Sequence, residues 1–448
     1  MSSKEPAWVK AEDTFQLMRF FDGIDIDENI VATYFIEVPT ADPVMWAESF
    51  ALEQTTGTWA RSHAETKEIR EVSGGKLLSL FKIPGLANAY VMQIAFPTRN
   101  IPANMGALLA AVAGNVTLFR SESQEISVKL WDLTFPKTWL KEFKGPKFGV
   151  QGIRNYLNIP ERPILNNMIK PCVGHDLSVH IELFKEAAYG GMDTIKDDEL
   201  LTDVPYNAFF DRLSKCMEIV DRKYQEIGEK TLYCINATDR VDKVIEKAER
   251  AVQAGANCIM LNSSLCLEVL RAVAEDPSIK VPVLYHMCFT GTITKDEKGG
   301  IYYPLYVKLA RMCGADIVLV PDYRGKFTGF DRQLCLQSVS ALLTPLLHIK
   351  PSLALIGGGV HPGLIPVIVE SYGRDVLIGA GGAVHAHPMG SRAGARALRQ
   401  AVEAVMNGTP LRIAAEKHEE LRVAIQKWGV AEREDETSLI SRIYDFKR

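Results

Sequence analysis

From about residue 150 onward, short apolar runs alternate with amphipathic stretches. Eight apolar runs predict strands, at residues 164–170, 192–196, 232–236, 257–261, 283–287, 316–320, 353–356 and 376–378. Between them, apolar positions recur at helical spacing, as in 241–248 and 393–406. Eight strand–helix units are the number in a closed (β/α)8 barrel, whereas a doubly wound open sheet seldom needs so many. We therefore expect an α/β TIM barrel over residues 149–448, ending in a charged helical cap over 416–448.

The first 148 residues have a different pattern. Residues 30–38 and 89–96 predict strands, and residues 43–54 and 103–113 predict helices. This mixture predicts a smaller α+β domain of the ferredoxin-like kind over residues 1–148, placed before the barrel.

Composition excludes several classes of protein. Lys and Arg number 51 against 55 Asp and Glu, a net charge of −4, so no basic footprint for nucleic acid or a membrane surface is present. No apolar run reaches the length of a membrane span, and the N-terminus lacks the pattern of a signal peptide. The eight cysteines are scattered singly, and Cys234, Cys258 and Cys288 fall in apolar runs typical of buried thiols. We therefore expect a cytoplasmic protein.

One lysine stands among three carboxylates at the second predicted strand, in the segment 190–199. The period of two along a strand places Lys196 and Asp198 on the same face, and Glu199 follows at the strand end. Carboxylates this close repel each other unless a cation lies among them. That cation could be the lysine itself. Alternatively, Lys196 could react with CO2 to form a carbamate, which with Asp198 and Glu199 would supply three oxygen ligands to Mg²⁺. A solvated charged loop is the remaining interpretation.

Other polar residues follow other predicted strands, where the active sites of such barrels lie. Lys170 ends the first strand, and desolvation with a nearby metal would lower its pKa and suit a general base. His286 ends the fifth strand and could be a base, bind a substrate hydroxyl or pack in the core. Lys326 lies in the loop after the sixth strand. Glycine turns follow the seventh and eighth strands and could bind phosphate through backbone amides or simply make tight turns; they contain Gly358, Gly359, Gly381 and Gly382.

These motifs resemble the large subunit of ribulose-bisphosphate carboxylase (RuBisCO). Besides 190–199, eight blocks occur in the order of that family: 53–59, 114–115, 170–171, 236–238, 286, 325–326, 357–359 and 387–390. The resemblance implies that Lys196 carries the activating carbamate, Lys170 shuttles a proton and Lys326 closes over substrate on a mobile loop. It also implies an antiparallel homodimer with shared sites, in which four residues of the small domain reach the barrel of the partner: Glu53, Thr58, Trp59 and Asn115.

The chain departs from the carboxylase where that enzyme grips its second phosphate. Met287, Leu319 and Gly357 stand where the family has arginine, histidine and serine, and Cys172 replaces a lysine. Methionine in place of arginine removes a bidentate phosphate anchor. The chain therefore resembles a non-carboxylating RuBisCO-like protein, which implies Mg²⁺-assisted enolisation of a sugar monophosphate.

An apolar tail, such as the methylthio group of methionine-salvage intermediates, would suit Met287 and Leu319 and favours an enolase or isomerase. Asn115 stands where the methionine-salvage enolases carry lysine, which counts against that subtype. Three alternatives stay open. A decarboxylase (a lyase) or hydrolase of a branched oxo-sugar-acid phosphate would use the same enediolate chemistry. A Schiff-base aldolase would use Lys170 or Lys196 without a metal. A non-catalytic regulatory protein would keep only the fold.

Overall fold

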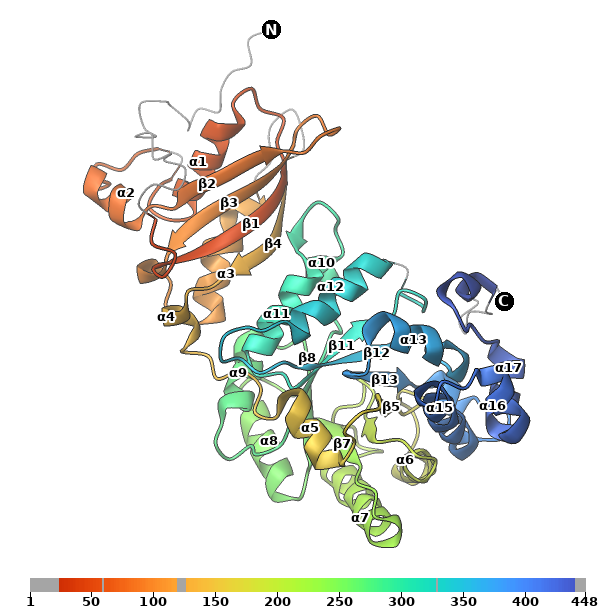
Figure 1. The fold of residues 1–448 in the computed structure, drawn as a ribbon. Coiled ribbons are helices and arrows are strands. Elements are labelled where there is room, and N and C mark those ends of the chain that lie inside the picture. Colours follow the sequence, from red (N-terminus) through yellow and green to blue (C-terminus); the bar gives the residue numbers. More distant parts are fainter. Residues whose placement is uncertain (1–23, 59, 119–125, 328, 440–448) are drawn as a thin grey trace. The chain divides into compact units, whose positions relative to one another are not determined.

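The computed structural model describes residues 24–58, 60–118, 126–327 and 329–439 (Figure 1). The chain forms two compact units, one of residues 1–143 with 290–306 and the other of residues 144–289 with 307–448. The first change from one unit to the other, between residues 143 and 144, lies within a few residues of the expected boundary between 148 and 149. Segment 290–306, which the sequence pattern assigned to the barrel, groups instead with the N-terminal unit.

The smaller unit is a five-stranded sheet with helices, as the mixed pattern predicts. Its strand order is β10-β4-β1-β3-β2, with β1 antiparallel to both β3 and β4. Alternate side chains of β1 are buried, and the hydroxyl of Tyr34 donates to the carbonyl of Val112 at 2.7 Å, which ties the sheet to α3. The elements are β1 (Asn29–Glu37), α1 (Pro43–Glu53), α2 (Lys67–Ser73), β2 (Lys76–Lys82), β3 (Ala89–Pro97), α3 (Met105–Ala113), η3 (Asn115–Leu118), β4 (Ser127–Thr134), α4 (Lys137–Leu140), α10 (Gly291–Thr294) and β10 (Gly300–Ile301).

Strand β10 explains why segment 290–306 leaves the barrel pattern. Gly300 and Ile301 pair in parallel with Lys129 and Leu130 of β4. The ammonium of Lys129 donates to the carbonyls of Thr294 and Gly299, each at 3.1 Å. A two-residue strand has no readable periodicity, so the sequence could not reveal this pairing.

The larger unit contains a closed barrel of eight parallel strands in the order β11-β12-β13-β5-β6-β7-β8-β9. This confirms the expected barrel. The strands are β5 (Ile164–Met168), β6 (Thr194–Lys196), β7 (Leu232–Asn236), β8 (Cys258–Asn262), β9 (Val283–His286), β11 (Ile317–Pro321), β12 (Leu353–Gly357) and β13 (Val376–Ala380). The helices that follow them are α6 (Leu177–Tyr189), α7 (Phe209–Ile227), α8 (Val244–Gln253), α9 (Leu267–Glu275), α11 (Tyr303–Met312), α12 (Arg332–Leu343), α13 (Ile365–Tyr372) and, after the single-turn α14 (Gly382–His385), α15 (Ser391–Met406).

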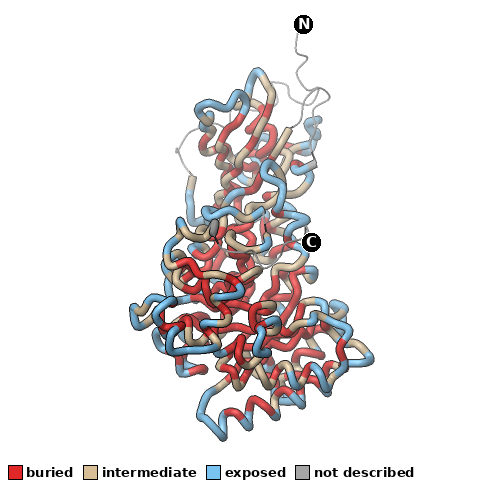
Figure 2. The backbone as a smooth tube through the Cα atoms, turned by 90° about the vertical axis from the view of Figure 1, so that its right-hand side faces the viewer, coloured by how far each residue is buried: buried red, intermediate tan, exposed pale blue. Residues whose placement is uncertain are grey.

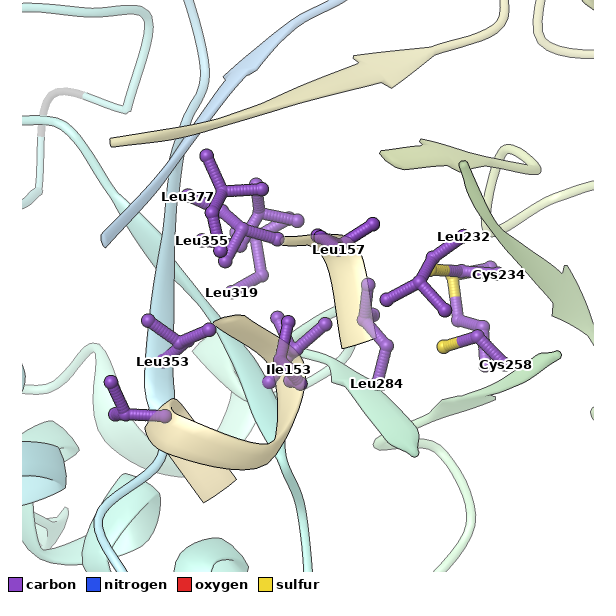
Figure 3. Packing of buried hydrophobic residues seen from close by; sticks show 14 of the residues in the cluster. Ile153, Leu157, Leu232, Cys234, Cys258, Leu284, Leu319, Leu353, Leu355 and Leu377 are labelled. Atoms are coloured by element: carbon purple, nitrogen blue, oxygen red, sulfur yellow. The ribbon is translucent and has the colours of Figure 1, made fainter. Parts of the chain in front are cut away.

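A layer of apolar side chains fills the barrel. Leucines from several strands and the thiols of Cys234 and Cys258 meet Ile153 and Leu157 of α5 (Gly149–Leu157), as Figure 3 shows. Strands β7, β8, β11, β12 and β13 are buried over their whole length. Figure 2 shows the buried backbone in red, with exposed segments in pale blue around it. Burial of Cys234 and Cys258 confirms the interpretation as core thiols, but Cys288 is only partly buried because it lies beyond the end of β9.

The C-terminal region is helical, as the sequence indicates. It contains α16 (Leu411–Lys417), α17 (Glu419–Trp428) and the 3-10 helix η5 (Glu434–Leu439), and residues 440–448 of the expected cap lie outside the described residues. Among the described residues, no helix combines the length and the apolar character that crossing a bilayer requires.

Candidate active site

Strand register decides which side chains reach the C-terminal end of the barrel, its mouth. Met168 pairs with Lys196 across β5 and β6, and Asn262 pairs with His286 across β8 and β9. A pocket of about 140 Å³ opens at this end. Its lining includes Lys170, Glu199, His286, Lys326, Gly358, Gly359, Gly381 and Gly382. Eight of the residues singled out from the sequence therefore share one cavity.

The lysine–carboxylate cluster lies beside this pocket. Lys196 is 1% exposed, and its ammonium lies 3.5 Å from a carboxylate oxygen of Glu199 and 2.8 Å from the carbonyl of Asp197. Asp198 is equally buried and forms an ion pair with Lys170. Burial raises the pKa of Glu199, but the positive charges of Lys196 and Lys170 outweigh this and hold that pKa below its ordinary value.

The ion pair with Asp198 corrects one expectation for Lys170. Burial alone would lower the pKa of Lys170, as predicted, but the hydrogen bond to Asp198 more than offsets burial and the pKa is raised. The ammonium also lies 3.0 Å from Sγ of Cys172. Lys170 can therefore accept a proton only after Asp198 has exchanged this partner for another cation.

His286 faces the same carboxylate from β9. Its Nε2 lies 3.3 Å from Glu199, and its Nδ1 accepts the backbone N–H of Cys288 at 3.2 Å. Burial, reinforced by the charge of Lys196, holds the pKa of His286 well below its ordinary value. A neutral ring that accepts at Nδ1 carries its proton on Nε2, so the N–H side of His286 lies near the carboxylate of Glu199.

Two asparagines hold the loop after β6. The amide nitrogen of Asn262 donates to the carbonyl of Glu199 at 2.8 Å, and that of Asn236 donates to the same carbonyl at 3.1 Å. The sequence drew attention to Asn236 but missed Asn262. The available signal was its place at the end of the apolar run 257–261.

A second missed residue, Asp197, points away from the pocket into a buried polar network. One carboxylate oxygen accepts the hydroxyl of Tyr233 at 2.7 Å, and the other accepts two N–H groups of Arg212 at 3.0 and 3.1 Å and the backbone N–H of Asn236 at 3.0 Å. Arg212 and Asp197 are both 0% exposed. Lys196 and Asp198 thus pair with the pocket residues Glu199 and Lys170, while Asp197 holds the segment through this buried network.

The glycine turns after β12 and β13 line the same pocket as Lys170 and Glu199. Gly358 and Gly359 have φ values of 99° and 116°, which strongly favour glycine. The backbone N–H of Lys326 donates to the carbonyl of Gly358 at 2.8 Å, so the loop after β11 rests on this turn. In the described part of the chain, the amides of Gly358, Gly359, Gly381 and Gly382 donate to no protein acceptor. They are available to an anion.

The small-domain residues lie within the N-terminal unit. Glu53 ends α1, where burial raises its pKa, Thr58 follows in a loop, and Asn115 begins η3. Trp59 lies outside the described residues. That these residues contact the barrel of a partner subunit stays a prediction.

The donor set can be tested for a divalent cation. Within the described residues, no three His, Cys, Asp or Glu side chains lie close enough to hold a metal. Asp198 and Glu199 are each paired with a lysine, which balances their charges. Carbamylation of Lys196 would convert one positive charge into a negative oxygen donor beside Glu199. The resulting three anionic oxygen groups fit Mg²⁺, and they require a cation for charge balance.

Two stretches of the chain match the two domains of one protein family. Residues 24–139 match "Ribulose bisphosphate carboxylase large chain, N-terminal domain", and residues 149–428 match "Ribulose bisphosphate carboxylase large chain, catalytic domain". The chain belongs to the RuBisCO large-chain family. The resemblance drawn from the sequence motifs is therefore confirmed.

Individual relatives agree with the RuBisCO-like branch. A RuBisCO-like protein of Archaeoglobus fulgidus is 41% identical over 420 residues, which cover 90% of this chain and 94% of the relative. A 2,3-diketo-5-methylthiopentyl-1-phosphate enolase of Geobacillus kaustophilus is 36% identical over 417 residues, with coverage of 90% and 99%.

Solved structures agree as well. An octameric RuBisCO of Pyrococcus horikoshii superposes with a TM-score of 0.85 at 30% identity and coverage of 93% and 99%. A RuBisCO-like protein of Alicyclobacillus acidocaldarius superposes with a TM-score of 0.81 at 31% identity and coverage of 89% and 100%. Enzymes named as enolases among the relatives support an enzyme of the RuBisCO-like family.

Proposed function

We propose that this RuBisCO-like protein enolises a sugar monophosphate with an apolar tail, of the 2,3-diketo-5-methylthiopentyl-1-phosphate class. One observation carries the proposal: Glu199, Lys170 and a glycine cradle line the same pocket, and Lys196 and Asp198 lie beside it in ion pairs with Glu199 and Lys170. Enolisation needs a polarised carbonyl, a base near the adjacent carbon and an anchor for the rest of the substrate. The pocket offers candidates for all three.

The first part of the proposal concerns Lys196. Carbamylated Lys196 would bind Mg²⁺ together with Asp198 and Glu199. Bound Mg²⁺ supplies Lewis-acid polarisation of the substrate carbonyl. The chain contributes the geometry: Asn262 and Asn236 fix the carbonyl of Glu199, and Nε2 of His286 lies 3.3 Å from its carboxylate. These contacts restrict the directions in which the ligands can move.

The second part assigns proton transfer and anchoring. Lys170 would take the substrate α-proton, with His286 as the competing base. The backbone amides of Gly358, Gly359, Gly381 and Gly382 would receive the phosphate, and Lys326 would add a positive charge from the loop after β11. Helix α14, which begins at Gly382, is a single turn, so we attribute anion binding to the amides and Lys326 rather than to a helix dipole.

The remaining lining supports a monophosphate. Met287 and Leu319 line the pocket, and Leu319 belongs to the barrel core. A second phosphate placed against them would lose its hydration shell without receiving charged donors in exchange. Carboxylation of a bisphosphate is therefore not part of the proposal, and a thioether or alkyl tail is.

The partner of the proposed enzyme is a second copy of the chain. RuBisCOs of solved structure include a dimeric protein of Hyperthermus butylicus and the octameric protein of Pyrococcus horikoshii. We propose a homodimer in which Glu53, Thr58, Trp59 and Asn115 complete the site of the other subunit. Mixing inactive Lys196→Ala subunits with inactive Glu53→Ala subunits should restore part of the activity if sites are shared.

The direct test is an assay with 2,3-diketo-5-methylthiopentyl 1-phosphate. Protein preincubated with Mg²⁺ and bicarbonate should form the enol, detected by its ultraviolet absorbance and by ³¹P NMR. Lys215→Met, on the exposed surface of α7, serves as a matched lysine control and should retain activity. Failure of wild-type protein to convert any apolar-tailed diketo monophosphate would contradict the proposal.

A further inference from the structure

The strand ends around the barrel mouth divide into a polar and an apolar half. Strands β6 to β9 end in Lys196, Asn236, Asn262 and His286. The other four strands bring Met168, Leu319 and Gly379 of β13 to the pocket lining, and Gly357 of β12 lies beside the end of Met168. The two glycines bring no side chain, so another residue must cover their part of the floor.

Met168 covers it. A Cβ atom built on Gly379 would lie 2.6 Å from Cε of Met168, and one built on Gly357 would lie 2.9 Å from the same atom. The end of the methionine therefore occupies the space that side chains from β12 and β13 would fill. Met168 also packs against the barrel core cluster while lining the pocket. Its thioether is the boundary between core and cavity on this side.

A methionine suits a boundary of this kind. Its unbranched, polarisable side chain fills irregular space and makes favourable contacts with sulfur and alkyl groups. Met287, a further pocket residue, is also packed against the core cluster. Two methionines and Leu319 thus form a continuous apolar floor, which can hold a short apolar group but offers no charged donor to a phosphate.

We infer that Met168 is a specificity-determining residue, which limits the length of the apolar tail that the pocket accepts. The inference rests on the proposed function. Because Gly357 and Gly379 have no side chains that could fill the space vacated by the end of Met168, shortening this one side chain deepens the floor without disturbing the charged cluster at the end of β6. A longer tail can then enter where Cγ, Sδ and Cε lay.

The test compares diketo monophosphates that carry methylthio, ethylthio and propylthio tails. With wild-type protein, kcat/KM should fall about tenfold or more for each added methylene, the range by which apolar pockets discriminate a single carbon. Met168→Ala should shift the ratio of propylthio to methylthio kcat/KM at least tenfold toward propylthio. Met168→Leu, which nearly conserves volume, should leave the ratio within about threefold.

Met260 provides a matched control. It is the same residue type, on β8 in the same barrel core, and is 0% exposed. Met260→Ala should lower the melting temperature by a cavity effect but leave the tail preference unchanged. Should Met168→Ala fail to fold, Met168→Val removes the same reach with a smaller loss of volume and gives the same comparison.

The outcomes separate the two proposals. Turnover of none of the three compounds by wild-type protein would contradict the proposed function. Turnover by wild type with an unchanged tail ratio in Met168→Ala or Met168→Val would leave the function standing and overturn the role of Met168.

Discussion

Replacing Arg212 with methionine should lower the stability of the fold and weaken the proposed Mg²⁺ site. The guanidinium is 0% exposed and makes five hydrogen bonds of 2.7–3.4 Å, two of them to Asp197 and the others to Asn207 and Thr202. Removing it leaves the carboxylate of Asp197 buried without its cation. Breaking a buried ion pair in this way costs about 3–5 kcal/mol. For a domain of this size, that corresponds to a fall in melting temperature on the order of 10 °C.

The functional consequence follows from the sequence position of Asp197. It lies between Lys196 and Asp198, so a carboxylate that leaves its network displaces both neighbours in the pocket. Calorimetry should show the lower melting temperature, and titration calorimetry in bicarbonate should show Mg²⁺ binding weakened at least tenfold. Lys215→Met on the same helix breaks only an exposed pair with Glu218 and should cost no more than about 0.5 kcal/mol.

The refuting result is specific. A stable Arg212→Met protein, with a melting temperature within about 2 °C of wild type and unchanged Mg²⁺ affinity, would show that the network neither stabilises the barrel nor positions the cluster.

Four further predictions concern the site and the pH response. Lys196→Ala should abolish tight Mg²⁺ binding and the activation by bicarbonate; full activity of wild-type protein in CO2-free, chelator-treated buffer would contradict this. Ribulose bisphosphate should not be carboxylated at a useful rate, because each lost charge-assisted phosphate contact costs roughly 1.5–3 kcal/mol; incorporation of labelled CO2 at carboxylase-like rates would refute it. Lys170→Met should stop exchange of the substrate α-proton with solvent while substrate affinity stays within a few-fold of wild type. Lys326→Met should act mainly by raising KM. Loss of exchange in His286→Gln together with normal exchange in Lys170→Met would show that His286, and not Lys170, is the base. Burial lowers the pKa of His361 to about 4, so the unfolded chain binds more protons below its own pKa near 6.5. The contribution of neutral His361 to the free energy of unfolding is therefore complete above pH 6.5 and falls by about 2 kcal/mol at pH 5. Replacing this histidine, as in His361→Phe, should reduce the fall in melting temperature between pH 7 and pH 5.

The barrel could be predicted because its strands are short, apolar and regularly spaced. Each of the eight predicted runs overlaps an observed strand, with ends that differ by a few residues at most. The small sheet was predicted only in part. Strands β2 and β4 and the two-residue β10 were missed. Strands β4 and β10 pair with segments far away in the chain, whereas β2 forms a hairpin with the neighbouring β3.

The residues of the candidate site could also be predicted only in part from the sequence. Residues at strand ends could be placed because parallel strands deliver their carboxyl ends to one mouth. The partners that set their chemistry could not. The raised pKa of Lys170 depends on contact with Asp198 across two strands, and the network of Asp197 depends on Arg212 from the following helix. The position of Met168 over two glycines follows from barrel closure, which no local pattern encodes.

The most direct test of the central claim follows proton exchange by ¹H NMR. The protein, with 2,3-diketo-5-methylthiopentyl 1-phosphate in deuterated buffer, is measured with Mg²⁺ and bicarbonate, and again after removal of both. If Lys196 supports Mg²⁺-dependent enolisation, the substrate α-proton signal should disappear rapidly in the first sample, persist in the second, and persist in Lys196→Ala under both conditions. Equal exchange in both wild-type samples, or no exchange in either, would contradict the account.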